Sequence, residues 1–342
     1  MAPHKHRANE VAVLMPFYNA ASTLGETLDT IQGQTLSNFT LIAVDDGSND
    51  NSATIVRQRM QHDPRIQLLQ PGRQGVVGAM NSALAHCRSP TVARMDADDL
   101  MEPERLEKQL GFLKENPEID LVGSRVSLFP EELILEGFYE YIRWQNSCIT
   151  PEQIAHNIYV ELPIAHPSVM FRRKVVMDAG GYRDGDFPED YELLLRLHQR
   201  GHQMAKLPET LLHWRDSGER LTRTDGRYRR EAFDIIRAHY LAQDPRLKQG
   251  RPLVFWGAGR KTRKRIAHLL QHGHRSSAWI DIDPNKIGNT IDGTRVVAPE
   301  WLAQEEKPFV LSYVSNHGAR ELIAKDLRAM GYVEGKDYLM VG

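Results

Sequence analysis

Residues 92–100 read Val92-Ala93-Arg94-Met95-Asp96-Ala97-Asp98-Asp99-Leu100. The apolar start is typical of a short buried strand, and three carboxylates follow where that strand ends. So much negative charge in one place is costly unless a cation neutralises it. Hard divalent ions such as Mg²⁺ and Mn²⁺ prefer oxygen ligands of this kind. The stretch therefore predicts a metal site at a strand end. The alternative is an acidic helix start, where aspartate caps the helix and suits its dipole.

Three more apolar runs precede this strand, and each is followed by a stretch with helical periodicity. The runs cover residues 11–15, 39–44 and 66–69, and the helices are expected to start near Ser22, Ser52 and Ala79. Strands that alternate with helices at this spacing form a parallel sheet with right-handed crossovers. We therefore predict an α/β fold with a Rossmann-like, mostly parallel sheet.

Polar residues follow the predicted strands at their carboxyl ends, where ligands bind in such sheets. They cover residues 16–19, 45–50 and 96–99, and a glycine-rich loop at 72–78 adds Arg73, which is a candidate phosphate ligand or an ordinary surface arginine. Because parallel strands end at one edge of the sheet, we expect these segments to form a single site although they lie far apart in the chain.

The second half of the chain contains a further α/β pattern. An acidic, aromatic-rich insert covers residues 129–144, and helices are predicted over 151–159 and from 187 to about 199. A strand at 253–256 then leads into Gly257-Ala258-Gly259 and a basic helix. We predict a flexible tail at residues 1–10, a catalytic domain at 11–248 and a small Rossmann-like α/β domain at 249–342.

The composition indicates an ordinary cytoplasmic protein. The chain has 342 residues, enough for two domains, and its net charge of −2 favours no polyanionic partner overall. Cys87 and Cys148 lie far apart, which predicts unpaired thiols in a reducing compartment. No apolar run reaches the roughly 20 residues of a membrane span. These features argue against secreted disulfide-rich and integral membrane classes, and they do not indicate an oligomeric state.

Residues 11 to about 220 resemble the family 2 glycosyltransferases with the GT-A fold. The resemblance implies inverting transfer of a sugar from a nucleotide donor, usually a UDP-sugar, with Mn²⁺ or Mg²⁺. It is carried by four motifs in the family's order: Val13-Leu14-Met15-Pro16-Phe17-Tyr18-Asn19, Val44-Asp45-Asp46-Gly47-Ser48, Met95-Asp96-Ala97-Asp98-Asp99 and Pro188-Glu189-Asp190-Tyr191-Glu192-Leu193.

The resemblance assigns roles on the donor side. It implies that Asp46 accepts a hydrogen bond from the uracil ring, that Asp96 contacts the ribose and that Asp98 binds the metal. A turn in which Asp46 is only a local acceptor is the alternative for that residue. Asp99 is expected to cap the following helix, and orienting a neighbouring metal ligand is the alternative. The remaining members of the predicted nucleotide-sugar site are Pro16, Tyr18, Asn19 and Arg73.

The acceptor side needs a base, because an inverting displacement has to remove the proton of the acceptor hydroxyl. The resemblance implies that Asp190 is this base, with Glu189 as the nearest rival and a solvated helix start as the alternative. His166 is a candidate for the acceptor side and His213 for the metal or the diphosphate. A structural role is equally compatible with either histidine.

The whole chain, with Trp256-Gly257-Ala258-Gly259-Arg260 and residues 280–286, resembles an animal branch of family 2. Its members were named β-1,3-N-acetylglucosaminyltransferase-like and are associated with galactosylation of queuosine in tRNA. This resemblance implies UDP-galactose as donor, with N-acetylglucosamine as the second choice of sugar, and tRNA as acceptor. Basic clusters at residues 215–230 and 260–265 are compatible with RNA phosphates, and two solvated helix faces are the alternative.

Three other functions stay open. The acceptor of the same chemistry could be a bacterial surface polysaccharide or its lipid-linked precursor. The chain could also bind a nucleotide sugar without catalysis. An NAD-dependent oxidoreductase is suggested by Gly257-Ala258-Gly259 and Asp281, but Thr262 stands at the third glycine position of that fingerprint. This last hypothesis also leaves the four glycosyltransferase motifs unexplained.

Overall fold

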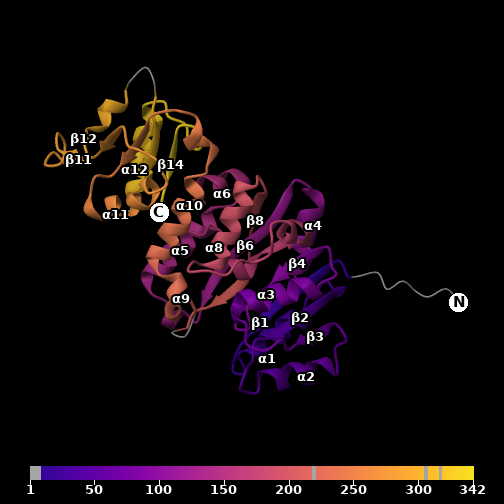
Figure 1. Cartoon of the computed structure of the whole chain (residues 1–342). Coiled ribbons are helices and arrows are strands. Elements are labelled where there is room, and N and C mark those ends of the chain that lie inside the picture. The colour runs from indigo at the N-terminus through magenta and orange to yellow at the C-terminus, as the bar shows by residue number, and fades with distance from the viewer. Residues whose placement is uncertain (1–8, 218–220, 304–306, 316–317) are drawn as a thin grey trace. The chain divides into compact units, whose positions relative to one another are not determined.

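The structure is a computed structural model that describes residues 9–217, 221–303, 307–315 and 318–342. Contacts between residues divide the chain into two compact units (Figure 1). The first contains residues 1–151, 164–185 and 200–224, and the second contains 152–163, 186–199 and 225–342. The predicted α/β class is confirmed. Residues 1–8 of the predicted tail lie outside the described residues.

In the first unit, the described strands form a mostly parallel sheet in the order β3-β2-β1-β4-β7-β6-β8-β5. Strands β3, β2, β1 and β4 are parallel to one another, as the alternation of apolar runs and helices predicts. Strands β6 and β8 are also parallel, whereas β7 runs antiparallel to β4 and β6. The bounds are β1 Val11–Phe17, β2 Phe39–Asp45, β3 Ile66–Leu69, β4 Thr91–Arg94, β5 Leu100–Met101, β6 Ile119–Phe129, β7 Met170–Arg172 and β8 Gln203–Arg215.

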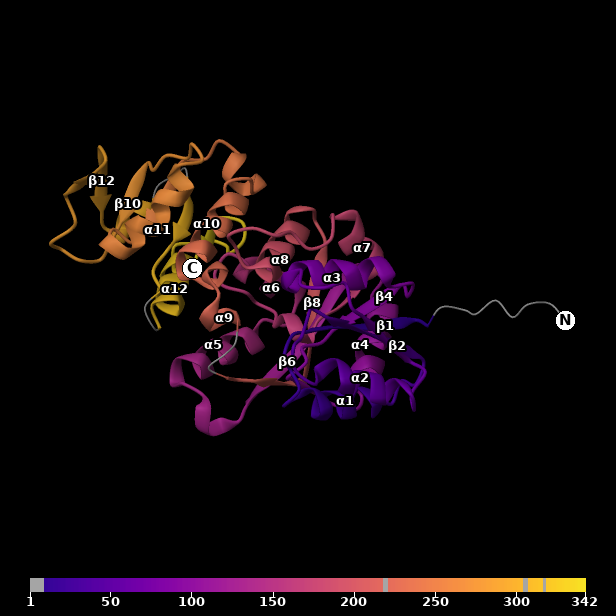
Figure 2. The ribbon, with the colours of Figure 1, turned by 60° about the horizontal axis from the view of Figure 1, so that its bottom comes forward.

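Helices cover both faces of this sheet. Val11, Val13 and Met15 alternate along β1 and share one apolar core with α1, α2 and α4. Helix α3 lies on the opposite side of the strands from α1 and α2 (Figure 2). The bounds are α1 Leu24–Gln32, α2 Ser52–Met60, α3 Gly75–His86, α4 Arg105–Glu115, α5 Glu136–Ser147, α7 Arg173–Asp178 and α9 Leu221–Thr224.

Two elements of the first unit differ from the sequence prediction. Helix α3 starts at Gly75 rather than near Ala79, because a distant aspartate caps its first turn, as described below. From the sequence we also predict a short strand over 204–207, and this stretch is the beginning of the much longer β8, which pairs along most of its length with β6. Strand β6 covers residues for which the sequence pattern did not predict a strand.

The described strands of the second unit form a sheet in the order β11-β12-β10-β9-β13-β14, parallel except for β11. Strand β9 lies between β10 and β13, so the sheet has the Rossmann-like order predicted for the C-terminal region. The bounds are β9 Leu253–Trp256, β10 Ala278–Ile280, β11 Thr290–Ile291, β12 Thr294–Val297, β13 Phe309–Ser312, β14 Tyr338–Met340, α6 Pro151–Asn157, α8 Glu189–Gln199, α10 Arg230–Leu241, α11 Arg260–Leu270 and α12 Ala319–Ala329.

The contact-based division differs from the boundary predicted near residue 248. Helix α10 packs against both α8 and α11, so α8 and residues 225–248 group with the C-terminal sheet. The ion pairs of Arg265 with Asp234 (3.1 Å) and of Lys264 with Glu231 (3.5 Å) join α11 to α10. Among the described residues, no helix has both the length and the apolar character needed to cross a lipid bilayer.

Candidate functional site

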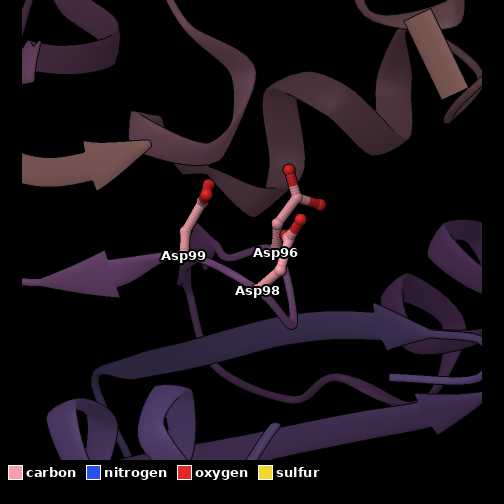
Figure 3. A group of neighbouring side chains, drawn as sticks. All are labelled: Asp96, Asp98 and Asp99. Atoms are coloured by element: carbon pink, nitrogen blue, oxygen red, sulfur yellow. The ribbon is translucent and has the colours of Figure 1, made fainter. Parts of the chain in front are cut away.

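Three aspartates occupy the turn that follows β4 (Figure 3). Asp96, Asp98 and Asp99 each offer a carboxylate oxygen, and these oxygens lie within 4.8 Å of one another. Asp99 is fully buried, whereas Asp96 and Asp98 are partly exposed. Carboxylates so close together repel one another strongly unless a cation neutralises them. The turn therefore has the donor set expected of a Mg²⁺ or Mn²⁺ site.

The surroundings of Asp99 fit such an ion. Its Oδ1 accepts a hydrogen bond from the main-chain nitrogen of Arg215 at 2.8 Å, while its buried Oδ2 has no hydrogen-bond partner among the described residues. Burial, followed by the charges of Asp96 and Asp98, raises the pKa of Asp99 well above its usual range. A buried carboxylate oxygen without a partner is costly, and a divalent cation would supply the missing charge. A helix cap was the favoured prediction for Asp99, and the structure groups its carboxylate with those of Asp96 and Asp98.

Asp96 is joined to a buried arginine that the sequence did not single out. Arg94, the last residue of β4, is 5% exposed and forms an ion pair with Asp96. Nearby, the Nε2 atom of His166 lies 2.8 Å from the hydroxyl of Tyr182. Burial, and then the charge of Arg94, lower the pKa of His166 well below its usual range. His166 is therefore a buried, neutral ring, as the structural alternative requires, and contact with an acceptor stays a prediction.

The buried His166 makes stability dependent on pH. Below about pH 6.5 this histidine is protonated in the unfolded chain but not in the folded chain. The contribution of His166 to the free energy of unfolding therefore falls as the pH drops below about 6.5 and is constant above that pH. From pH 6.5 to 5.5 the loss amounts to at most about 1.4 kcal/mol. Urea unfolding at pH 7.5 and 5.5 measures it. We expect H166Q to depend on pH less than the wild type, and an equal dependence would contradict the assignment.

The predicted nucleotide side of the site contains Asp46, directly after β2. Its carboxylate accepts the main-chain N–H groups of Gln74 at 2.6 Å and Gly75 at 3.0 Å. Asp46 therefore caps α3 across a long stretch of chain, which explains the early start of that helix. A carboxylate oxygen can accept two hydrogen bonds, and Oδ1 accepts that of Gln74, so recognition of a uracil N–H by Oδ1 is compatible with this capping role.

A stacked pair lies beside Asp46. The guanidinium of Arg73 lies 3.5 Å from the centre of the Tyr18 ring, and its Nη1 lies 3.0 Å from Oδ2 of Asp46. Asn19, with a left-handed φ of 50°, accepts from the main-chain nitrogen of Asn49 at 2.9 Å. Tyr18 and Asn19 follow β1 and Asp46 follows β2, whereas Arg73 lies in the loop between β3 and α3.

The predicted nucleotide residues share one edge of the sheet with the three aspartates. Pro16 pairs in register with Val44 of β2. On the other side of β1, Leu14 pairs with Arg94, the last residue of β4 before the aspartate turn. Strand β1 thus lies between the nucleotide residues that follow β2 and the metal-type carboxylates that follow β4.

Replacing Asp46 with asparagine tests both of its roles. Asparagine keeps one acceptor oxygen but turns an N–H₂ group toward a main-chain N–H, so we expect unfolding free energy to fall by about 1–2 kcal/mol. We also expect UDP affinity, measured by calorimetry, to fall at least about tenfold. The control is D63N. Asp63 is equally buried and accepts from Arg65 at 2.8 Å, but it precedes β3 at the other edge of the sheet. D63N should lose stability alone, and equal UDP affinity in D46N and wild type would refute the role in base recognition.

His213 does not belong to the carboxylate group. It lies in β8 opposite Leu100, and both ring nitrogens have protein partners: Nδ1 is 2.7 Å from Ser127 Oγ, and Nε2 is 2.7 Å from Glu102 Oε1. To bind a metal or a diphosphate, the ring would have to give up one of these partners. These contacts are those of a histidine with a structural role, and the predicted role of His213 as a ligand stays a prediction.

The predicted base lies in the second unit. Asp190 is in the first turn of α8, where its Oδ1 accepts from the main-chain nitrogen of Tyr191 at 2.7 Å, and it is partly exposed. Glu189 is buried and accepts the hydroxyl of Tyr228 at 2.7 Å. Burial, followed by the charges of Glu189 and Asp190, raises the pKa of Tyr228, so its hydroxyl keeps its proton. Of the two carboxylates, Asp190 is the more accessible.

Two arginines at the aspartate turn escaped the sequence analysis. In the sequence, Arg94 was treated only as part of an apolar strand. A charged residue inside such a strand was the one signal that could have indicated a role at the site. Arg215 was counted among a basic cluster, whereas the structure places it against Asp98 and Asp99. Nothing local in the sequence indicates that contact, because the two segments are more than 100 residues apart.

Comparison with known proteins gives concordant results. The sequence model described as "Glycosyl transferase family 2" matches residues 12–180, which contain the first three motifs and end before Asp190. The amylovoran biosynthesis glycosyltransferase AmsE of Erwinia amylovora is 30% identical over 218 residues, covering 63% of this chain and 79% of the relative. The putative glycosyltransferase EpsE of Bacillus subtilis is 30% identical over 225 residues, covering 64% of this chain and 77% of the relative.

Solved structures confirm the GT-A-like fold. The S. aureus TarS 1-349 structure in complex with UDP-GlcNAc superposes with a TM-score of 0.54 at 15% identity, covering 77% of this chain and 80% of that one. A longer S. aureus TarS structure gives a TM-score of 0.52 at 18% identity, and this chain covers 43% of its length. At these identities the likeness shows the fold alone.

Proposed function

The chain belongs to glycosyl transferase family 2, and we therefore propose that it is an inverting, metal-dependent hexosyltransferase that uses a UDP-sugar. Galactose is the favoured sugar and N-acetylglucosamine the second. The observation that carries the proposal is the turn with Asp96, Asp98 and Asp99, which lies beside the nucleotide residues at one sheet edge. The unpaired thiols of Cys87 and Cys148 agree with a cytoplasmic location.

On the donor side, the chain would hold the nucleotide from two directions. Asp46 would accept from the base while Tyr18 and Arg73 flank the nucleoside, and Asp98 with Asp96 and Asp99 would hold a divalent ion. That ion, when bound, neutralises charge on the departing diphosphate. The buried Oδ2 of Asp99 supports this assignment, because it has no partner within the described chain.

On the acceptor side, we assign the base to Asp190. Its carboxylate takes the proton of the acceptor hydroxyl while that oxygen bonds to the anomeric carbon and the bond to the diphosphate breaks. The configuration at the anomeric carbon inverts, because attack and departure occur on opposite faces of the sugar. The accessibility of Asp190 favours it over Glu189, whose carboxylate is buried against Tyr228.

We propose queuosine-bearing tRNA as the first acceptor. Helix α11 supports this choice, since it exposes four cations and has no acidic side chain. They are Arg260, Lys261, Arg263 and Lys264, of which Lys264 pairs with Glu231 of α10 at 3.5 Å. Other arginines of the basic segments are ion-paired: Arg223 lies 2.7 Å from Asp216, and Arg227 lies 2.7 Å from Asp225. Arg220 lies outside the described residues.

A glycan is the second candidate acceptor. It is favoured by the names of the relatives, which include an amylovoran biosynthesis enzyme and the O-antigen biosynthesis glycosyltransferase WbnJ of Escherichia coli. The residues proposed to bind the donor do not distinguish between the two acceptors, because they would contact only the UDP-sugar. A nucleotide-sugar-binding protein without catalysis is a third possibility, and slow metal-dependent release of UDP from a sugar donor would exclude it.

A donor and acceptor screen tests the proposal. UDP-galactose, UDP-N-acetylglucosamine and UDP-glucose are incubated with total tRNA, with tRNA lacking queuosine and with oligosaccharides, and products are read by mass. We expect a mass gain of one hexose on queuosine-bearing tRNA only, with binding that weakens steeply as salt rises. A product on oligosaccharides alone would select the glycan acceptor, and no product with any donor would refute catalysis.

A further inference from the structure

The turn that carries the three aspartates is held by hydrogen bonds to its main chain. The carbonyl oxygen of Ala97 accepts the hydroxyls of Thr23 and Thr27, each at 3.0 Å. Thr27 lies inside α1 and is fully buried, and Thr23 immediately precedes that helix. Because these two bonds use a main-chain oxygen, they fix the turn without occupying a carboxylate.

Arg215, the last residue of β8, holds the next two residues of the turn (Figure 3 shows the carboxylates). Its Nε donates to the carbonyl oxygen of Asp98 at 2.6 Å, and its main-chain nitrogen donates to Oδ1 of Asp99 at 2.8 Å. Its Nη2 lies 2.6 Å from Glu26 of α1, and its guanidinium lies 4.3 Å from the centre of the Phe129 ring. One side chain thus connects α1 and the end of β6 to the aspartate turn.

The charge of Arg215 and its geometry predict opposite effects on metal binding. A guanidinium near a cation site repels the cation, so its removal would strengthen binding if charge alone mattered. Side chains that orient metal ligands, in contrast, typically contribute 10–100-fold to metal affinity. Since Arg215 bonds directly to the turn, the geometric effect is the one its contacts support.

We propose that Arg215 is a positioning residue that shapes the Asp96–Asp99 turn so that its carboxylates share one divalent cation. This inference rests on the metal-dependent function proposed above. It concerns the side chain of Arg215, because the main-chain bond to Asp99 survives any substitution other than proline. A lysine at this position keeps the positive charge but cannot place an N–H group at the Nε position while also reaching Glu26.

The experiment measures Mn²⁺ binding to the full chain with UDP present, by calorimetry and by the spin resonance signal of free Mn²⁺, so that no turnover is needed. We expect R215A to bind Mn²⁺ 10–100-fold more weakly than the wild type. The Mn²⁺ affinity of R215K should be close to that of R215A, because a positive charge without the guanidinium N–H groups does not hold the turn. In kinetic assays, R215A should need more Mn²⁺ for half-maximal rate and recover most of its kcat at saturating Mn²⁺.

Arg65 provides a matched control in the same unit. Its side chain is 26% exposed, against 20% for Arg215. It also pairs with a carboxylate, Asp63, at 2.8 Å and lies over an aromatic ring, that of Phe39, at 4.4 Å. The hydrogen-bond and ring partners of its side chain among the described residues are Gln32, Ser37, Asp63 and Phe39, which lie outside the aspartate turn. R65A should therefore lose comparable thermal stability and keep wild-type Mn²⁺ affinity.

Each result decides the matter. Unchanged or tighter Mn²⁺ binding in R215A overturns the inference and leaves the proposed function intact. An equal loss in R65A also overturns it, because the effect is then general destabilisation. If the wild type binds neither Mn²⁺ nor Mg²⁺, the inference falls together with the metal part of the proposed function. Binding and turnover of UDP-sugars in a chelator then show whether the glycosyltransferase itself stands.

Discussion

Replacing Asp98 with alanine is expected to abolish metal-dependent binding of the UDP-sugar and to lower the transfer rate roughly 10³-fold or more. Removal of one carboxylate leaves Asp96 and Asp99, of which Asp96 is already ion-paired with Arg94 and Asp99 is buried. The remaining oxygens form a poor site for a hard cation. Calorimetry with UDP and Mn²⁺, with and without chelator, measures the loss directly.

Two companion variants interpret that result. D29A removes an exposed aspartate of α1, which pairs with Arg59 at 2.7 Å, and should behave as the wild type. D99N keeps the shape of Asp99 but cannot ionise, so it should weaken metal binding less than D98A does. If D98A binds the donor with wild-type affinity and the same response to chelator, the assignment of the metal to this turn is wrong.

Asp190→Asn has the second large effect that we expect. The variant should bind UDP-sugar and metal normally, while kcat falls about 10²–10⁴-fold, because an amide cannot take the acceptor proton. The helix start should persist, since asparagine also caps helices well. Pre-steady-state transfer to the acceptor, together with donor affinity by calorimetry, separates the two quantities.

Glu189→Gln is the matched control for that experiment. Its amide oxygen can still accept the hydroxyl of Tyr228, so we expect a modest loss of stability and a kcat close to wild type. The opposite pattern, with an active D190N and an inactive E189Q, would assign the base to Glu189. Loss of donor binding in D190N would instead indicate that Asp190 supports the fold of α8.

The parts of the fold that the sequence predicts well are those with local periodicity. Strands β1 to β4 are short buried runs bounded by polar turns, and Ile66–Leu69 and Leu253–Trp256 coincide with the predicted strands. Strand β6 was not predicted because apolar and polar residues are mixed along it without a regular pattern. It pairs with β7 and β8, which come from segments far along the chain. Pairing of that kind leaves no periodic trace in the strand itself.

The same distinction holds for the site. Asp96 and Asp98 could be predicted as site residues because the motif is contiguous, and Asp46 because it follows a clear strand. The cap that Asp46 provides to α3 spans nearly 30 residues and could not be read locally. The clamp of Arg215 on the aspartate turn spans 117 residues, and the basic composition around it suggested a different role. Long-range hydrogen bonds are therefore what the structure adds to the motifs.

The stack of Arg73 on Tyr18 has a kinetic consequence. The ring that is proposed to flank the nucleoside has a guanidinium 3.5 Å from its centre, and Asp46 holds that guanidinium in place. A pyrimidine that stacked on this same face would first have to displace the arginine. We therefore expect nucleotide association on that face to be slower than simple collision allows, because only molecules in which Arg73 has moved off the ring would be receptive.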